Sequence, residues 1–239
     1  MTSSAEIFSS AIIALGAFNP AIFSPDWLER NNLLGKEDAE AAREHKSLVV
    51  SHQVTVFETE WFAIQVLENQ FSLTSKGALS PAFQDLAVGI LTLVPHTPVT
   101  AIGLNFMGHY RLNSESDWHK FGDVIAPKKI WKELFQEDKY EPGIADLTML
   151  IQEGQRGQEI KSGDQRHISI QPSSKIKYGV FLSYNNHRVV TANEGDNKTA
   201  AECAARIAEV DWNSAWDDAV NVFEGPISKS LTSDERKFA

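Results

Sequence analysis

Two segments of this chain show the same order of expected elements, three short strands followed by one helix with an apolar stripe. The first copy covers residues 48–94 and the second covers residues 144–223. Apolar residues alternate with polar ones in each strand, as at Val180, Leu182 and Tyr184, so one face of each strand is expected to be buried. This order predicts an α+β fold, in which two strand-strand-strand-helix units form one larger antiparallel sheet or a pair of sheets, backed by helices.

The two helices are expected where the apolar spacing changes from two residues to three and four. Ser80 and Pro81 stand at the N-cap and the first position of the earlier helix, and Pro95 ends it. The later helix begins with alanines and continues with large aromatic residues, which lets its start approach the sheet closely. No residue identity links the two copies, so gene duplication and a simple α+β meander both stay open.

Three parts are expected within one compact whole. Residues 1–112 form an N-terminal α+β unit that opens with an apolar strand, and residues 143–239 form a C-terminal α+β unit. Between them, residues 113–142 form a helical connector. Aromatic residues are interleaved with polar ones there, which is typical of an ordered segment. The connector is expected to contain a short helix with Ile130, Trp131 and Leu134 on one apolar face.

Composition and charge narrow the class of protein. The chain has 239 residues and a formal net charge of −10, which repels phosphate and argues against a nucleic-acid partner. No apolar run approaches the roughly 20 residues that cross a bilayer, so no membrane contact is expected. Cys203 is the one cysteine, has no partner for an intramolecular disulfide, and is read as a small buried apolar residue. We expect a soluble cytoplasmic protein.

A metal site is the first chemical possibility that the residues offer. His109, His119 and Asp123 form the tightest group among the seven histidines and their acidic neighbours, and one helical turn brings the last two to the same side. These spacings match no tight ligand motif, and ordinary hydrogen-bonded histidines explain them as well. We therefore expect no metal, and these residues are the ones to try first if a ligand-binding cleft exists.

A nuclease-like constellation is the second possibility. Asp146 precedes the triplet Glu159-Ile160-Lys161, and two carboxylates with a lysine can hold Mg²⁺ and orient a water against a phosphate. However, the triplet falls in the polar stretch 153–165 rather than in a buried strand, and the net negative charge counts against a nucleic-acid substrate. Glycine-rich phosphate loops and a Gly-x-Ser-x-Gly elbow are absent, so no cofactor is expected.

One strand carries a family resemblance. Residues 99–106 read Val-Thr-Ala-Ile-Gly-Leu-Asn-Phe, follow a helix and a proline, and enter a long strand. They resemble the recurrent isoleucine-glycine-leucine strand of an uncharacterised bacterial family of cytoplasmic proteins of about this length. Gly103 is expected to allow close approach across the sheet. The resemblance covers the first repeat only and implies a two-unit α+β fold. The family has no established activity, so no functional residue follows from it.

These observations favour a non-enzymatic protein-interaction or assembly subunit of a bacterial cytoplasmic complex. Two small sheets expose strand edges that must be covered, so self-association through a strand edge or an apolar helix face is expected. Trp118 and Trp131 of the connector are the candidate binding residues. The alternative is an enzyme or ligand-binding protein that uses a cleft between the two units, such as a metal-dependent hydrolase or nuclease.

Overall fold

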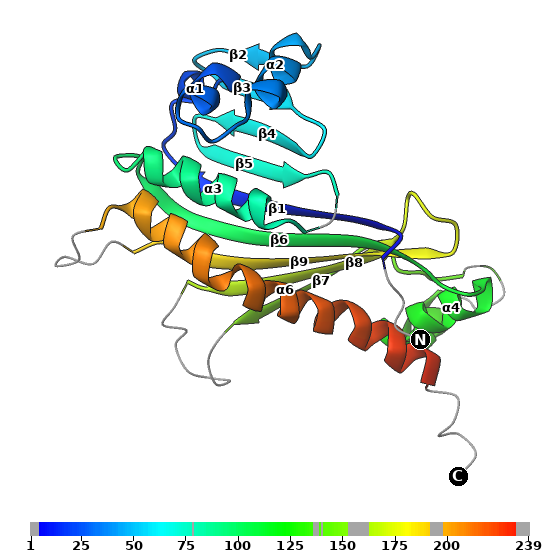
Figure 1. Ribbon diagram of the computed structural model, residues 1–239. Coiled ribbons are helices and arrows are strands. Elements are labelled where there is room, and N and C mark those ends of the chain that lie inside the picture. Colours follow the sequence, from blue (N-terminus) through cyan, green and yellow to red (C-terminus); the bar gives the residue numbers. More distant parts are fainter. Residues whose placement is uncertain are drawn as a thin grey trace.

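All strands of the described chain belong to one antiparallel sheet. The structure, a computed structural model, describes residues 5–77, 79–135, 139, 141–152, 163–191 and 198–232. Within these residues the sheet has nine strands in the order β2-β3-β4-β5-β1-β6-β9-β8-β7 (Figure 1). The strands are β1 (Ile7–Gly16), β2 (Val49–Val50), β3 (Val54–Glu58), β4 (Phe62–Leu67), β5 (Gln70–Ser75), β6 (Val99–Arg111), β7 (Leu147–Gln152), β8 (Gln165–Pro172) and β9 (Gly179–Val189).

In the described part of the chain, helices follow four of the strands, β1, β5, β6 and β9. They are the 3-10 helix η1 (Pro20–Ile22) and the α-helices α1 (Pro25–Arg30), α2 (Lys36–Glu44), α3 (Pro81–Leu93), α4 (Glu115–Ile125), α5 (Lys129–Leu134) and α6 (Ala200–Thr232). Side-chain caps start three of them: Ser24 Oγ accepts the Trp27 backbone N–H at 3.2 Å, Ser114 Oγ accepts the Asp117 N–H at 3.1 Å, and Thr199 Oγ1 accepts the Glu202 N–H at 3.3 Å.

The structure shows that each repeated unit is longer than its sequence pattern. Each unit opens with one long strand, β1 or β6, continues with two helices, returns through its outer strands and ends on a long helix. β1 and β6 pair with each other at the centre of the sheet, and β5 and β9 flank them in equivalent positions. The two units are therefore related by an approximate two-fold arrangement about the β1–β6 pair.

One face of the sheet carries the helices and the core. Figure 1 shows α3 and α6 side by side across this face, and α6 packs on β6 and β9. The strand positions beneath them are apolar and almost fully buried, as at Ile12, Leu104 and Phe106. Aromatic side chains of α6 complete this core: the Trp212 ring lies 4.8 Å from the ring of Phe106 and 5.7 Å from that of Phe83.

The opposite face of the sheet has no helix over it in the described part of the chain, and two asparagines lie at its centre among small and apolar residues. Asn105 and Asn185 are paired across β6 and β9 there. Asn105 Nδ2 donates to the carbonyl oxygens of Gly103 and Ala11, at 3.1 and 3.3 Å. A Cβ atom at Gly103 would lie 2.9 Å from Asn185 Oδ1, so the close approach at this glycine is to side chains.

The α+β class and the antiparallel sheet backed by helices are confirmed, and of the two arrangements expected, the single sheet is found. Three local features of the structure differ from the elements expected from the sequence. The connector holds a second helix, α4, begun by the Ser114 cap, and α6 continues beyond residue 223 to Thr232. The first copy has four strands instead of three, because residues 51–53 separate the paired strands β2 and β3. No helix among the described residues is long and apolar enough to cross a membrane.

Candidate interaction surface

The strand at one end of the sheet, β7, has an unusual amount of apolar surface in contact with solvent. It pairs with β8 on one side only, so the backbone groups of its other side have no strand partner in the described sheet. Met149, Leu150 and Ile151 are between 45 % and 50 % exposed. Because successive side chains point to opposite faces, β7 exposes apolar groups on both faces of the sheet. An edge of this kind is a template for pairing with another strand.

Helix α5 presents a second apolar surface. Ile130, Trp131, Leu134 and the following residue Phe135 are between 52 % and 67 % exposed, and none of the residues of α5 is buried. Monomeric proteins rarely expose several large apolar side chains on one short helix, and such patches mark interaction sites. The apolar face expected in the connector therefore exists, but it faces solvent rather than the core.

A groove joins α5 to the start of β7. It has a volume of about 830 Å³ and is lined by Trp131 and Phe135 of the helix region and by residues 141–147, the last of which opens β7. Ion pairs lie along its border: Lys132 Nζ is 3.1 Å from a Glu141 oxygen, and Lys128 Nζ is 3.3 Å from Asp123 Oδ1 and 3.4 Å from Glu141 Oε1. The edge strand, the groove and the apolar helix thus form one surface with a polar rim, which is the anatomy of a protein interface. We call it the α5–β7 surface.

The charges at this border are matched within the chain. The hydrogen bond from Lys132, followed by that from Lys128 and the charge of both ammonium groups, holds the pKa of Glu141 below its ordinary value. Glu141 is thus a carboxylate at neutral pH, and its charge is shared between two lysines. A partner that covers the α5–β7 surface does not need to bring an opposite charge to this border.

The candidate metal ligands lie on different sides of the sheet. His109 is on the helix-free face of β6, where its Nδ1 is 2.8 Å from Ser173 Oγ and its ring is 4.8 Å from that of Phe181. Burial lowers its pKa, and the charge of Lys175 adds to this effect. His119 is exposed on α4, on the helical side, and Asp123 pairs with Lys128. No group of three or more His, Cys, Asp or Glu side chains suited to a metal lies among the described residues.

The nuclease-like residues are only partly visible. Asp146 is exposed in the segment that leads into β7 and lines the groove of the α5–β7 surface. Glu159 and Lys161 lie outside the described residues. The nuclease hypothesis therefore stays a prediction: Mg²⁺-dependent cleavage that is lost in Glu159→Ala and Lys161→Ala.

The two candidate tryptophans have different surroundings. Trp118 of α4 is half-buried against the core, and its Nε1–H donates to the Gly179 carbonyl oxygen at 3.1 Å. Trp131 is 52 % exposed on α5. Trp131 thus belongs to the α5–β7 surface, whereas Trp118 holds α4 on the sheet.

Comparisons with known proteins give no family: no model of a protein family matches the chain, and no curated protein matches it either. Function has to be argued from the geometry alone. Sequence reasoning found the apolar face of α5 but treated β7 as an ordinary half-buried strand. The alternation of Leu147, Met149 and Ile151 is the same in an edge strand as in a covered one, so the sequence holds no signal for the exposure of β7.

Proposed function

We propose that this chain is a non-enzymatic assembly subunit of a bacterial cytoplasmic complex, and that it self-associates through the α5–β7 surface. The observation that carries the proposal is that an apolar edge strand, with no second strand partner among the described residues, meets an exposed apolar helix at one groove. Either feature alone leaves the partner open. Together they offer both backbone pairing and apolar burial at one place.

A second copy of the chain is the partner that the edge strand accepts most simply. A strand pairs with its own copy antiparallel about a two-fold axis, so β7 of each copy supplies the same residues to the other. The axis then lies near Met149 and Leu150, at the middle of the strand. The two nine-stranded sheets become one continuous sheet, and the edge backbone groups of β7 are satisfied in both copies.

The apolar helix residues supply the energy for such an interface. Fully burying a large apolar side chain contributes roughly 1.5–3 kcal/mol, and each copy brings four from the α5 region, Ile130, Trp131, Leu134 and Phe135. Association itself costs about 4–15 kcal/mol in lost freedom. Backbone pairing at β7 alone does not offset this cost, so we expect α5 to be required for a stable dimer.

The experiment compares two edges of the same sheet. A lysine on an edge strand opposes strand pairing. Leu150→Lys in β7 and Val49→Lys in β2 place the same charge at side chains that are 49 % and 46 % exposed. We expect wild type and Val49→Lys to form a concentration-dependent dimer in light scattering, and Leu150→Lys to stay monomeric with an unchanged circular dichroism spectrum.

Two results would overturn the proposal. One is a single monomeric wild-type species across all concentrations, with no partner recovered from cells. The other is a dimer that Val49→Lys and Leu150→Lys weaken equally, because the interface would then lie away from β7.

A further inference from the structure

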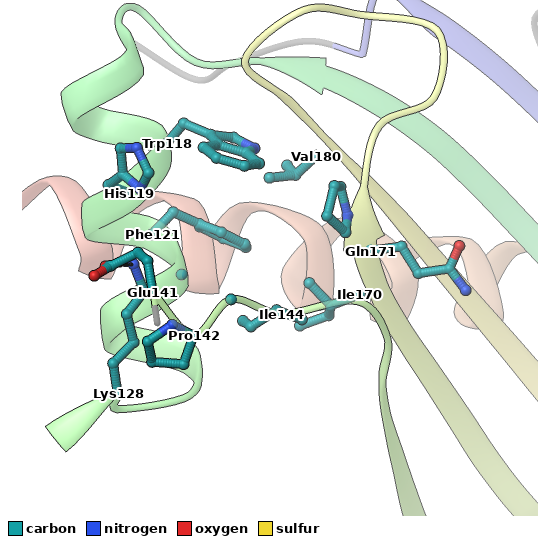
Figure 2. A pocket seen from close by; sticks show the side chains of 13 residues that line it. Trp118, His119, Phe121, Lys128, Glu141, Pro142, Ile144, Ile170, Gln171 and Val180 are labelled. Carbon is teal, nitrogen blue, oxygen red and sulfur yellow. Dashed lines mark hydrogen bonds and ion pairs between the residues drawn. The ribbon is translucent and has the colours of Figure 1, made fainter. Parts of the chain in front are cut away.

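A second hollow, smaller than the groove of the α5–β7 surface, lies beside α4. Figure 2 shows it between α4, the segment 141–144 and the strands β8 and β9. Its volume is about 220 Å³. The walls are apolar side chains, several of them almost fully buried: Trp118, Phe121, Pro142, Ile144, Ile170 and Val180.

Four side chains with polar groups border this cavity besides Trp118: His119, Lys128, Glu141 and Gln171. His119 is exposed and its ring lies 5.1 Å from that of Trp118, while the charged groups are paired with each other. The Nε1–H of Trp118 donates to the Gly179 carbonyl oxygen, and the ammonium group of Lys128 lies between Asp123 and Glu141. Gln171 borders the cavity, but its amide points away from it (Figure 2). The cavity therefore presents no unpaired charge to a ligand, and a charged ligand would lose its hydration without compensation.

The other half of the sheet shows what fills a space of this kind. There, the first helix after the long strand, α1, is held on the sheet by aromatic rings. The Phe23 ring lies 5.7 Å from that of Trp27, 5.9 Å from that of Phe71 and 6.2 Å from that of Phe18. In the C-terminal half, α4 has the same place in the order of elements but leaves the cavity beside Trp118 and Phe121.

We propose that this cavity binds a small, uncharged aromatic molecule of one or two rings. An apolar cavity of about 150 Å³ in a protein core stays dry and takes up benzene, so a cavity of about 220 Å³ has room for a somewhat larger ring system. The apolar walls match such a ring, and the edges of Trp118 and Phe121 offer aromatic contacts. The cavity shares Lys128 and residues 141–144 with the groove of the α5–β7 surface, whereas its walls at Trp118, Phe121, Ile170 and Val180 belong to the cavity alone.

Indole is the probe for this site, and two glycine variants test its location. Gly122 lines the cavity, and a Cβ atom there would meet no atom within 4 Å. Because Gly122 lines the cavity and has room for a Cβ atom, we expect the side chain of Gly122→Leu to occupy part of the cavity. Gly225, in α6, also has no atom within 4 Å of a Cβ position and lies away from the cavity, so Gly225→Leu is the matched control.

The expected result is saturable indole binding by the wild-type protein, measured by calorimetry or by ligand-observed NMR. Gly122→Leu should weaken it at least tenfold, and Gly225→Leu should leave it within twofold. Thermal unfolding checks that both variants are folded, and Ile170→Phe, at a residue that lines this cavity and not the groove, is a second cavity-filling variant with the same expectation. Absence of saturable binding to wild type, or equal affinity in the wild-type protein and a folded cavity-filling variant, overturns the proposal. Dimer formation is measured separately, so failure of one proposal does not imply failure of the other.

Discussion

The two ends of the sheet have the same order of elements but differ in the length of the edge strand and in how well the nearby helices are packed. At the N-terminal end the edge strand β2 has two residues, and the helices near it contribute buried side chains to the core, among them Leu28 and Ala42. Arg43 of α2 bonds Asp26 and Glu29 of α1, at 2.8 and 2.7 Å. At the C-terminal end the edge strand β7 has six residues, and α5 buries none.

Under the two proposals made above, this difference marks the end of the sheet at which a partner and a ligand bind. Both halves have a long strand, two α-helices and a set of outer strands. The same order of elements can therefore end in a well-packed edge or in an exposed one. Trp61 at the N-terminal end is half-buried and bonded to Asp38, whereas Trp131 at the other end is more than half exposed. We take the N-terminal end as the internally completed version, and the C-terminal end as the one that a partner and a ligand complete.

The largest expected effect separates the two ends by stability. Phe71 is fully buried in the aromatic cluster of the N-terminal half, so Phe71→Ala should lower the free energy of unfolding by about 3–5 kcal/mol. Phe135 is 56 % exposed, so Phe135→Ala should change it by no more than about 0.5 kcal/mol in the monomer. Urea unfolding measures both. Similar losses would mean that α5 is packed as firmly as α1.

The next largest effect is expected on the dimer dissociation constant, and it should differ between the two ends of the sheet. Trp131→Ala should raise the dimer dissociation constant by about 30-fold or more, because a central interface tryptophan contributes roughly 2 kcal/mol or more. Trp61→Ala removes the hydrogen bond to Asp38 Oδ2 and should lower stability while leaving the dissociation constant unchanged. Sedimentation velocity at several concentrations gives the constants. An equal change in both variants would remove the distinction between the ends.

A smaller effect should be equal at both ends, which makes it a control on the comparison. Ser24 and Ser114 cap the first helix of each half through the same bond to a backbone N–H. Ser24→Ala and Ser114→Ala should each lower the free energy of unfolding by about 1 kcal/mol. Chemical unfolding of the monomer measures this. A cost confined to Ser24→Ala would show that α4 adds nothing to the stability of the C-terminal half.

The smallest expected effect is a fall in the free energy of unfolding at acidic pH. Burial lowers the pKa of His187, the neighbouring His167 lowers it further, and Asp164 opposes the shift; burial also lowers the pKa of His109. The unfolded chain therefore binds more protons than the folded one as pH falls through about 6.5, so stability decreases there. His109→Gln with His187→Gln should make unfolding free energy less dependent on pH. An unchanged slope in the double variant would contradict the assignment.

The sequence predicts the local elements well and their partners poorly. Period-two alternation marks β4 and β5, and the wider spacing with Ser80 and Pro81 marks α3, since these signals depend on neighbours along the chain. In β3 the structure buries Thr55 and Phe57 instead of the alternating valines. β1 and β6 pair although they are far apart along the chain. The local sequence of either strand therefore does not indicate that they pair or that each begins a repeated unit. The same holds for the site: Ile130, Trp131 and Leu134 are visible as an apolar face, but whether the core covers that face is decided by tertiary packing.

The most direct test of the account is amide hydrogen exchange, measured on dilute and on concentrated wild-type protein. We predict that the amides of residues 147–152 exchange more slowly as concentration rises, because β7 gains a strand partner, while those of residues 49–50 in β2 exchange at a constant rate. Exchange in β7 that is independent of concentration, or protection that appears in β2 instead, would contradict the claim that the C-terminal end is completed by a second copy.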